Sequence, residues 1–527
     1  MKSRWPSWYG GAAVAALAVA FATPVQSSGC NVNAHFALVR SLERGTVVID
    51  RYHWQTCDKS YTDGHFYANK APGLAFAALP LYAALKLMGL ARDPLPSVQD
   101  FRAGYDDLRR DIWPLTLWVA AIPAVLLIVL VWRTADSVAP GYGLVTTVAL
   151  GVSTMLLPFA TLLFAHLLAA LLGFAAFALV RAEGEGRKNV AFAGAAGLLA
   201  GFAITTEYPL ALIAAFIGAY MLTQPDRLRR LTAYGVGAAA GVAPLALYNL
   251  AAFGSPTHNS YADYVRNQGQ TGHDEIGGLP GGFFGIGLPD PAAAAELILS
   301  HRGLLVATPV IGAALAGLVP LYRNGHRRDA LLVGGLFFAF LLYATGFFTP
   351  MGGDTPGPRY LFPTLPFLAL PLAAAWRRLP LTTLLLAAVS AVTMIAATLT
   401  GPVIGHDDTT VWFERLVGGD FVLTVVGLVG WSAGVLSALP FVGGIGAACA
   451  LAAAATRFET PWRPEVTTAV IAAVAWAVVA SVVPPLVHGD NELSLPLAIA
   501  LLGAVGTALG IQLRRLATSR RTESVRA

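Results

Sequence analysis

Charged residues are scarce in this sequence. Only 12% of its 527 residues are Asp, Glu, Lys or Arg, whereas 56% are hydrophobic. An ordinary soluble chain carries roughly a quarter charged residues, so a water-soluble domain of this composition could not cover its core with polar side chains. Because lipid is the solvent that accommodates such a chain, the composition predicts an integral membrane protein.

Cysteines and the common catalytic motifs are also rare. The chain has three cysteines, and none lies in a CxxC or Cys/His spacing of the kind that binds zinc. The sequence lacks the Walker A, GxSxG and HExxH patterns. Its basic residues form no stripe accompanied by stacking aromatics, so no nucleic-acid partner is expected.

The chain is rich in long apolar runs. Runs of about 17–25 residues cross the hydrocarbon core as helices, and about fifteen occur along the sequence. The expected fold is therefore all-α and polytopic, a single transmembrane domain over residues 1–527 with about 14–15 hydrophobic segments. The segments begin near Ala12, Gly73, Ile112, Gly141, Thr161, Val190, Pro209, Leu231, Leu304, Ala330, Tyr360, Leu381, Gly434, Val466 and Leu493.

Lysine and arginine predict how these segments are oriented. They gather in short connections such as Arg181–Lys188 and Arg227–Arg230 and in the tail, residues 513–527, which the positive-inside rule assigns to the cytoplasm. The same rule assigns residues 24–72 and 253–302 to the outer side, as two large extracytoplasmic loops. This pattern is typical of a protein of a bacterial-type inner (plasma) membrane.

The number of crossings stays open at one place. Two cytoplasmic termini require an even number of crossings, and from Arg181 onward the basic loops alternate with the outer ones. The inconsistency therefore lies between Gly73 and Gly141. The segment Arg92–Asp111 carries four arginines and five aspartates, so its charge does not place it, and the sequence leaves open which neighbouring run fails to cross.

The first outer loop concentrates residues that could carry chemistry. Within Cys30–Pro72, ionisable side chains alternate with aromatic rings, as sugar-binding and membrane-interface surfaces often require. A solvated loop is the plain alternative, but long ordered loops in compact proteins are usually functional. The side chains are Asp50, Asp58, Asp63, His35, His53, His65, Arg51, Lys59 and Lys70, interleaved with Tyr52, Trp54, Tyr61, Phe66 and Tyr67.

Two of the three cysteines share this loop. Cys30 and Cys57 are both expected on the side of the membrane that oxidises thiols, so we predict a disulfide between them. Two free thiols are the alternative. The third cysteine, Cys449, is alone in an apolar run.

Several phrases of the sequence resemble GT-C glycosyltransferases, and most of all the branch of protein O-mannosyltransferases and lipid A aminoarabinose transferases. Lys70–Gly73 stands where those families have Lys-Pro-Pro-Leu at the entry to a membrane helix. The resemblance implies a GT-C-like helix bundle, a polyprenyl-phosphate sugar donor, and inversion at the anomeric carbon. The phrases that carry it are Asn33–Arg44, Gly45–Asp50, Tyr67–Gly73 (YANKAPG), Thr161–His166 (TLLFAH), Thr206–Pro209 (TEYP) and Gly357–Leu372 (GPRYLFPTLPFLALPL).

The sequence departs from that family at the catalytic base. The family's acidic pair precedes the short helix of the first loop, and its two positions fall on Asn31 and Val32 here. Neither side chain can accept a proton from an acceptor hydroxyl, which glycosyl transfer requires. Another carboxylate must do so, and the candidates are Asp58, then Asp50, then Asp63.

Two cations are expected to bind the donor phosphate. Charge develops on the departing phosphate, so the site needs a positive group or a metal beside it. Lys70 and Arg359 are both predicted at the outer ends of membrane helices, at the depth of lipid headgroups. Arg359 could bind the phosphate bidentately, whereas Lys70 would act as a point charge. For each residue the alternative is an interfacial anchor whose charged end reaches the headgroups.

A second group of candidate site residues ranks below the aspartates and the two cations. His166 and Glu207 interrupt apolar runs, where ionisable groups are costly and usually functional or paired; polar contacts between helices are the alternative for both. Tyr67 and His65 of the first loop complete the group. The sequence leaves the cofactor unknown, with a divalent metal open.

The sequence therefore predicts a glycosyltransferase that moves a sugar from a polyprenyl-phosphate donor to a glycan, lipid or protein of the cell envelope, on the outer side of the membrane. The main alternative is a transporter or flippase of a lipid-linked glycan. Transporters usually place ionisable groups at the bilayer midplane and often show repeat symmetry, whereas here these groups concentrate in the outer loops. A non-catalytic member is the third reading, which the missing acidic pair keeps open.

Overall fold

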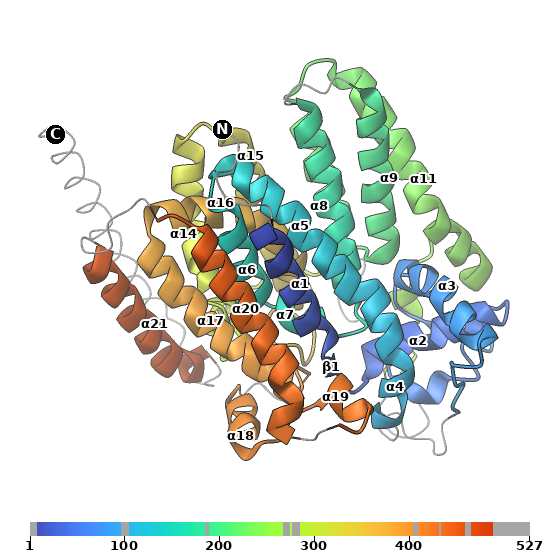
Figure 1. Cartoon of the computed structure of the whole chain (residues 1–527). Helices are drawn as coiled ribbons and strands as arrows, with labels where there is room; N and C mark the ends of the chain where they lie inside the picture. The colour runs from blue at the N-terminus through green and yellow to red at the C-terminus, as the bar shows by residue number, and fades with distance from the viewer. Residues whose placement is uncertain are drawn as a thin grey trace, which may run out of the picture.

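A computed structural model of the chain shows a predominantly helical protein (Figure 1). It describes residues 8–95, 105–184, 189–266, 275–276, 285–403, 409–431, 434–458 and 465–487. Within them, seven helices are long and apolar enough to cross a membrane, or eight if the bent pair Pro291–Ala307 and Val310–Arg323 counts as one span. The predicted fold class, an all-α polytopic membrane protein, is confirmed. The run near Leu493 and the tail, residues 513–527, lie outside the described residues.

The main bundle consists of helices that pack around a continuous apolar core. Leu, Val, Ala and Phe dominate that core, because most helix faces here turn towards another helix or towards lipid. The helices are α1 (Trp8–Ala22), α4 (Tyr105–Thr116), which continues through a π-helical turn (Leu117–Ala121) into α5 (Ile122–Val138), α6 (Gly143–Ser153), α7 (Leu156–Phe159), α8 (Ala165–Gly184), α14 (Val310–Arg323), α15 (Arg327–Gly346), α16 (Leu365–Arg378), α17 (Pro380–Thr400) and α20 (Leu439–Ala455). Helix α21 (Val466–Val487) packs against α17 and buries its apolar residues in a separate, smaller cluster.

Three further helices are α9 (Val190–Thr206), α10 (Leu210–Met221) and α11 (Arg227–Phe253). Helices α9 and α10 pack against α8, and α11 packs against α9 (α8, α9 and α11 are labelled in Figure 1). Helices α9 and α11 approach so closely that only glycine fits between them. A Cβ added at Gly201 would lie 2.2 Å from the carbonyl oxygen of Ala238, and one at Gly241 would lie 2.3 Å from that of Leu198. Such small-residue contacts are a common way for helices to pack in lipid.

Short elements gather at one end of the bundle, which we call the site face and which comprises the described parts of residues 24–72, 254–303, 347–364 and 409–431. They are β1 (Pro24–Val25), α2 (Cys30–Glu43), η1 (His53–Gln55), β2 (Lys59–Thr62), β3 (His65–Ala68), η3 (Ser260–Asp263), β4 (Val265–Arg266), β5 (Glu275–Ile276), α12 (Pro291–Leu299), α13 (Leu304–Ala307), η5 (Arg359–Thr364), α18 (Thr410–Gly418), β6 (Leu423–Thr424) and α19 (Val425–Leu428), with η6 (Gly434–Ala438) leading into α20. The strands form three antiparallel two-stranded sheets, β1–β6, β2–β3 and β4–β5.

The first and second outer loops lie together at this face, as the charge pattern predicts. The hydroxyl of Ser60 donates to the carbonyl of Ser260 at 2.6 Å, and the hydroxyl of Ser260 donates to the carbonyl of Asn69 at 3.0 Å. At the opposite end, Arg181 of α8 donates through Nε to Oδ2 of Asp329 on α15 at 3.0 Å. Arg181, the first residue of the basic segment Arg181–Lys188, and Asp329 therefore lie at one end of the bundle and the two loops at the other.

Helix α3 (Gly73–Leu87) begins and ends at the site face. The residues that follow it return to the first loop: Arg40 donates to the carbonyl of Pro94 at 3.1 Å, and the hydroxyl of Tyr52 donates to Asp93 at 3.1 Å. Lys86, in the last turn of α3, pairs with Glu43 at the end of α2. The run that begins near Gly73 therefore does not cross the bundle, which removes the odd crossing that the charge pattern left unexplained.

Candidate functional site

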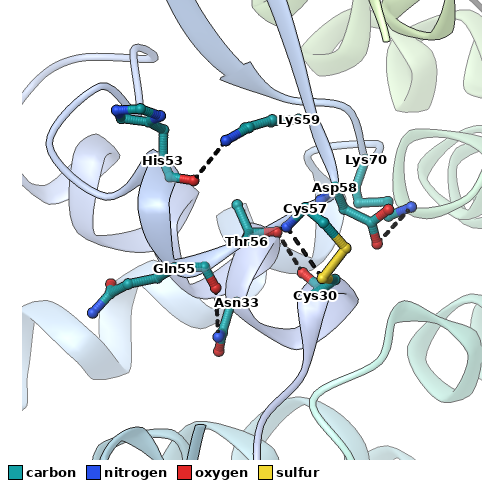
Figure 2. The surroundings of a disulfide bond; sticks show 9 residues. All are labelled: Cys30, Asn33, His53, Gln55, Thr56, Cys57, Asp58, Lys59 and Lys70. Atoms are coloured by element: carbon teal, nitrogen blue, oxygen red, sulfur yellow. Dashed lines mark hydrogen bonds and ion pairs between the residues drawn. A yellow bond between two sulfur atoms is a disulfide. The ribbon is translucent and has the colours of Figure 1, made fainter. Parts of the chain in front are cut away.

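A disulfide fixes the start of α2 to the segment that enters β2 (Figure 2). Cys30 and Cys57 are bonded with their Cα atoms 5.1 Å apart, which confirms the predicted pairing. The hydroxyl of Thr56 adds a hydrogen bond to the carbonyl of Cys30 at 2.7 Å. The link holds in place the residue after each cysteine, Asn31 on α2 and Asp58 before β2.

Asp58 forms an ion pair with Lys70, one of the two predicted phosphate ligands (Figure 2). The β2–β3 hairpin, in which Lys59 pairs with Ala68, brings the residue before β2 next to the residues after β3. Oδ2 of Asp58 lies 3.1 Å from Nζ of Lys70, and the two side chains are only 17% and 11% exposed. Burial lowers the pKa of Lys70, attraction to Asp58 raises it, and repulsion from Arg359 lowers it further.

A cavity of about 750 Å³ opens beside this pair. Its polar wall holds both predicted phosphate ligands, Lys70 and Arg359, and both intramembrane candidates, His166 and Glu207. These residues come from the first loop, from η5 and from the facing ends of α8 and α9. The other polar residues of the wall are Asn31, His35, Thr206, Tyr208, Asn249, Thr257, His258, Tyr261, Tyr343 and Tyr360.

The rest of the cavity is apolar and reaches the side of the molecule. Ile204, Leu212 and Leu245 line it on α9, α10 and α11, and Leu342 lines it on α15. Leu342 is 40% exposed, and Ala211, which also lines the cavity, is exposed as well. The cavity therefore has a charged end at the site face and an apolar end between α10 and α15, where exposed apolar side chains line it.

Arg359 enters the cavity from the first turn of η5. Its side chain lies over Gly352, where an added Cβ would be 2.5 Å from Cγ of Arg359 and where φ is +79°. Its Nη2 donates to the hydroxyl of Tyr360 at 3.4 Å, while its buried Nε has no hydrogen-bond partner. No carboxylate in the described part of the chain pairs with this guanidinium, so its charge remains available to an anion.

His166 and Glu207 form a second pair in the same cavity. Nδ1 of His166, at the start of α8, lies 2.9 Å from Oε1 of Glu207, just after α9. The pair joins two helices, which agrees with a polar contact between helices, and it also adds a carboxylate to the cavity wall. Because Thr206 lies against Gly73, the first residue of α3, the same end of α9 also contacts the segment that carries Lys70.

None of the three aspartate candidates lines the cavity itself. Asp58 reaches its edge through the ion pair with Lys70, whereas Asp50 and Asp63 lie elsewhere. The carboxylate of Asp50 is 42% exposed, where it binds Nδ1 of His65 at 2.7 Å and accepts the backbone N–H of Phe66 at 2.6 Å. Asp63 has a φ of +51° in the two-residue turn that joins β2 to β3, a position that favours Asp before Gly for its backbone geometry. The structure thus brings only Asp58 next to a predicted phosphate ligand.

The two second-group residues of the first loop are also away from the wall. His65 is exposed and binds Asp50. Tyr67 is buried, and its ring packs against Phe253 at a centroid distance of 5.1 Å. Their contacts indicate that they stabilise the loop.

Sequence reasoning assigned no binding role to several residues that the cavity brings together. Asn31 and His35 are four residues apart on α2, so they share one face of the helix, and that spacing was a usable signal. Asn249 of α11 and Tyr261 of η3 gave no comparable signal, because they join the site only through packing. The ring of Tyr261 lies 5.8 Å from Nζ of Lys70.

No group of three or more His, Cys, Asp or Glu side chains suited to a metal ion occurs among the residues that the structure describes. Asp58 and Glu207 each have a basic partner, Lys70 and His166. The cofactor stays open.

The fold and the site define a polytopic helical membrane protein with a cavity that is charged at one end and apolar at the other. No protein-family model matches the sequence, and no curated protein matches it. Solved structures do resemble it in fold. The apo structure of ArnT from Cupriavidus metallidurans has 16% identity and a TM-score of 0.49, over 89% of this chain and 80% of ArnT.

Two other solved structures are larger than this chain. The Archaeoglobus fulgidus oligosaccharyltransferase in its apo form has 13% identity and a TM-score of 0.43, over 89% of this chain, which spans only 58% of that protein. The arabinosyltransferase EmbB from Mycobacterium smegmatis has 14% identity and a TM-score of 0.41, over 97% of this chain and 41% of EmbB. These likenesses concern the fold alone.

Proposed function

We propose that this protein is a membrane glycosyltransferase that takes a sugar from a polyprenyl-phosphate donor. The observation that carries the proposal is the shape of the cavity beside Asp58 and Lys70, which has Lys70 and Arg359 at its charged end and an apolar end between α10 and α15. A lipid phosphate has the same division, an anionic head and an apolar chain. Its chain could enter from the bilayer while its phosphate reaches the two cations.

The two cations fit the departure of the phosphate. When the bond between the anomeric carbon and the phosphate oxygen breaks, the electron pair leaves with the phosphate, and the new negative charge lies beside Lys70 and Arg359. Arg359 has no carboxylate partner among the described residues, so it can bind the phosphate through two parallel hydrogen bonds. Lys70, which lies in the first loop and not in η5, contributes a point charge.

Asp58 is the proposed base. In the unliganded cavity its carboxylate is paired with Lys70. Binding of a donor phosphate competes for Lys70, which frees Asp58 to accept the proton of the acceptor hydroxyl. The hydroxyl oxygen then attacks the anomeric carbon as the polyprenyl phosphate leaves, so the proton ends on Asp58 and the electron pair on the phosphate.

The proposed acceptor is a glycan, lipid or protein of the cell envelope, reached from the site face. The positive-inside rule places the basic end of the bundle in the cytoplasm, and the site face then lies on the outer side of a bacterial-type inner membrane. The divalent metal remains an open part of the proposal.

Transfer by the purified protein tests the proposal. Wild-type protein in lipid nanodiscs, given polyprenyl phosphate carrying a radiolabelled sugar and a crude envelope extract as acceptor, is expected to move label from the lipid to the extract. A parallel assay follows movement of the same lipid across sealed vesicles. Movement across the vesicle membrane without any transfer would establish the transporter or flippase instead. If the protein showed neither movement nor transfer, both readings would be contradicted.

A further inference from the structure

Besides Nε of Arg359 and Nδ1 of His166, which is paired with Glu207, three buried polar atoms of the cavity residues have no hydrogen-bond partner in the protein. They are Oδ1 of Asn31, Nδ1 of His35 and Oδ1 of Asn249. His35 is 2% exposed and Asn249 is 3% exposed. Leaving a buried polar atom unpaired is costly, and such atoms are bonded in nearly all folded proteins. Three of them on one cavity wall therefore indicate where the polar groups of a ligand are bound.

These three side chains are neutral, unlike the cations of the same cavity. The two amides carry no charge, and burial together with the charge of Lys70 lowers the pKa of His35 to about 3. The imidazole is thus uncharged at neutral pH. Asn31 and His35 occupy one face of α2, whose first residue the disulfide holds. Asn249 is fixed because its Nδ2 donates to the carbonyl of His258 at 3.1 Å.

We propose that Asn31, His35 and Asn249 form a subsite for the sugar of the lipid-linked donor, and that this sugar is neutral and rich in hydroxyl groups. The proposal rests on the proposed function, because it places the sugar in the same cavity as the phosphate ligands Lys70 and Arg359. It also gives a role to Asn31, an amide at a position where the resemblance to GT-C enzymes implies a carboxylate.

The chemistry of the three atoms favours hydroxyl groups over charged substituents. An amide oxygen accepts a hydrogen bond, and the free ring nitrogen of a neutral imidazole accepts or donates one according to its tautomer. A hydroxyl can satisfy any of the three. A sugar carboxylate would meet two amide oxygens that repel it, and it would add a second anion beside the donor phosphate that Lys70 and Arg359 already bind. An ammonium group would be repelled by Lys70 and Arg359, and the carboxylate of Glu207 is already engaged by His166.

Binding measured without any acceptor tests the subsite. Dissociation constants are determined for the full-length protein in nanodiscs with undecaprenyl phosphate, with undecaprenyl phosphate glucose, and with the same lipid carrying an amino sugar or a uronic acid. We expect the glucose lipid to bind about tenfold tighter than the bare lipid, the sum of a few neutral hydrogen bonds. The two charged sugars should not bind tighter than the bare lipid.

Asn31→Leu and His35→Leu carry the mutational test, because Asn249 also holds its own loop. Each should weaken binding of the glucose lipid about three- to tenfold and leave binding of the bare lipid unchanged. The matched control is Asn324→Leu, an exposed amide at the end of α14 far from the site face, which should change neither. Size-exclusion profiles confirm that each variant is folded.

The outcomes separate the subsite from the proposed function. Equal binding of the bare and glucose lipids, or equal gains for charged and neutral sugars, would overturn the subsite while leaving the phosphate site intact. If the protein bound a soluble neutral glycan but did not bind the glucose lipid more tightly than the bare lipid, the subsite would belong to the acceptor, and its assignment to the donor would be overturned. Failure of every lipid to bind would overturn the proposed function and the subsite with it.

Discussion

At the scale of single residues, Asp58 is distinguished from the other aspartates by its partner. It binds Lys70 at the edge of the cavity, whereas the carboxylate of Asp50 is held at an exposed surface by His65. We expect Asp58→Asn, which nearly preserves shape, to slow sugar transfer by about 10²–10⁴-fold. Asp420→Asn, an exposed aspartate of the same face, should have no effect. If Asp50→Asn slows transfer and Asp58→Asn does not, the base is Asp50.

Arg359 tests the phosphate site separately from proton transfer. Arg359→Lys keeps the charge but removes the planar group that can make two parallel hydrogen bonds. Charge-assisted bonds are the strong ones, so kcat/KM for the donor lipid should fall about tenfold or more. The exposed Arg51 of the same face provides the control, as Arg51→Lys should leave kcat/KM unchanged. An unchanged kcat/KM in Arg359→Lys would show that this residue only anchors the chain at the interface.

His35 makes stability depend on pH. In the folded protein burial and Lys70 lower its pKa to about 3, with a further small decrease from His166 and an opposing effect of Asp58, whereas in the unfolded chain it is near 6.5. Between these values the unfolded state binds the extra proton, so stability falls as the pH decreases from about 6.5 to 3. The loss approaches about 1.4 kcal/mol per pH unit for this group alone.

The measurement compares thermal unfolding midpoints of wild type and His35→Gln at pH 7 and pH 5. Carboxylates that titrate in this range contribute equally to the pH dependence of stability in both proteins. Only the difference between the two proteins in stability lost from pH 7 to pH 5 therefore reports on His35. The variant should lose less stability than wild type on acidification. An equal loss in the two proteins would show that the imidazole is protonated in the folded state.

At the scale of elements, the contact between α9 and α11 depends on glycine. An added Cβ at Gly201 would meet the backbone of α11 at 2.2 Å, and backbone cannot move aside as a flexible side chain can. Gly201→Ala should therefore destabilise the protein by about 1–3 kcal/mol, seen as a lower unfolding midpoint in detergent. Gly218→Ala on α10, where nothing lies within 4 Å of the new methyl group, should be neutral or slightly stabilising. Equal midpoints for the two variants would contradict this packing.

The disulfide links the start of α2, which carries Asn31, to the segment that carries Asp58. It joins two residues that are 27 positions apart, a closure that contributes about 3–4 kcal/mol in the chain-entropy model. Removing it in Cys30→Ala/Cys57→Ala should lower the unfolding midpoint and weaken donor binding, since Asn31 and Asp58 are adjacent to the two cysteines. Mass mapping of wild type without prior reduction should find neither thiol alkylated, and alkylation of both would refute the bond in the native protein.

At the scale of the whole molecule, the path of α3 decides the topology. Because α3 returns to the site face, Arg92 should lie on the same outer side as the first loop. In a protein with Cys449→Ala, an impermeant maleimide applied to intact cells should label Arg92→Cys, whose side chain is exposed. It should not label Arg323→Cys, at the basic end of α14. Labelling of residue 92 only after permeabilisation would mean that α3 crosses.

Much of the fold followed from properties that are local in sequence. Run length and apolar composition predicted membrane helices, because a helix that crosses lipid must itself be long enough and apolar enough to do so. The charge of the short connections indicated which loops share a side. The crossing that the charge pattern left open has the same explanation. The apolar composition of the run near Gly73 suits lipid whether or not the run crosses, and only the contacts of Lys86 with Glu43 and of the following Pro94 with Arg40 return it to the site face.

The candidate site, like the fold, was only partly predictable from the sequence. Lys70 and Arg359 could be chosen from the sequence because each lies in a phrase that resembles a family and at an expected helix end. The choice between Asp58 and Asp50 was beyond the sequence, because both are loop aspartates with similar neighbours. The β2–β3 hairpin decides it by bringing Asp58 against Lys70 and leaving Asp50 on the opposite, exposed edge. Asn249 joins the wall only because α11 packs beside the first loop, a non-local contact that no sequence period encodes.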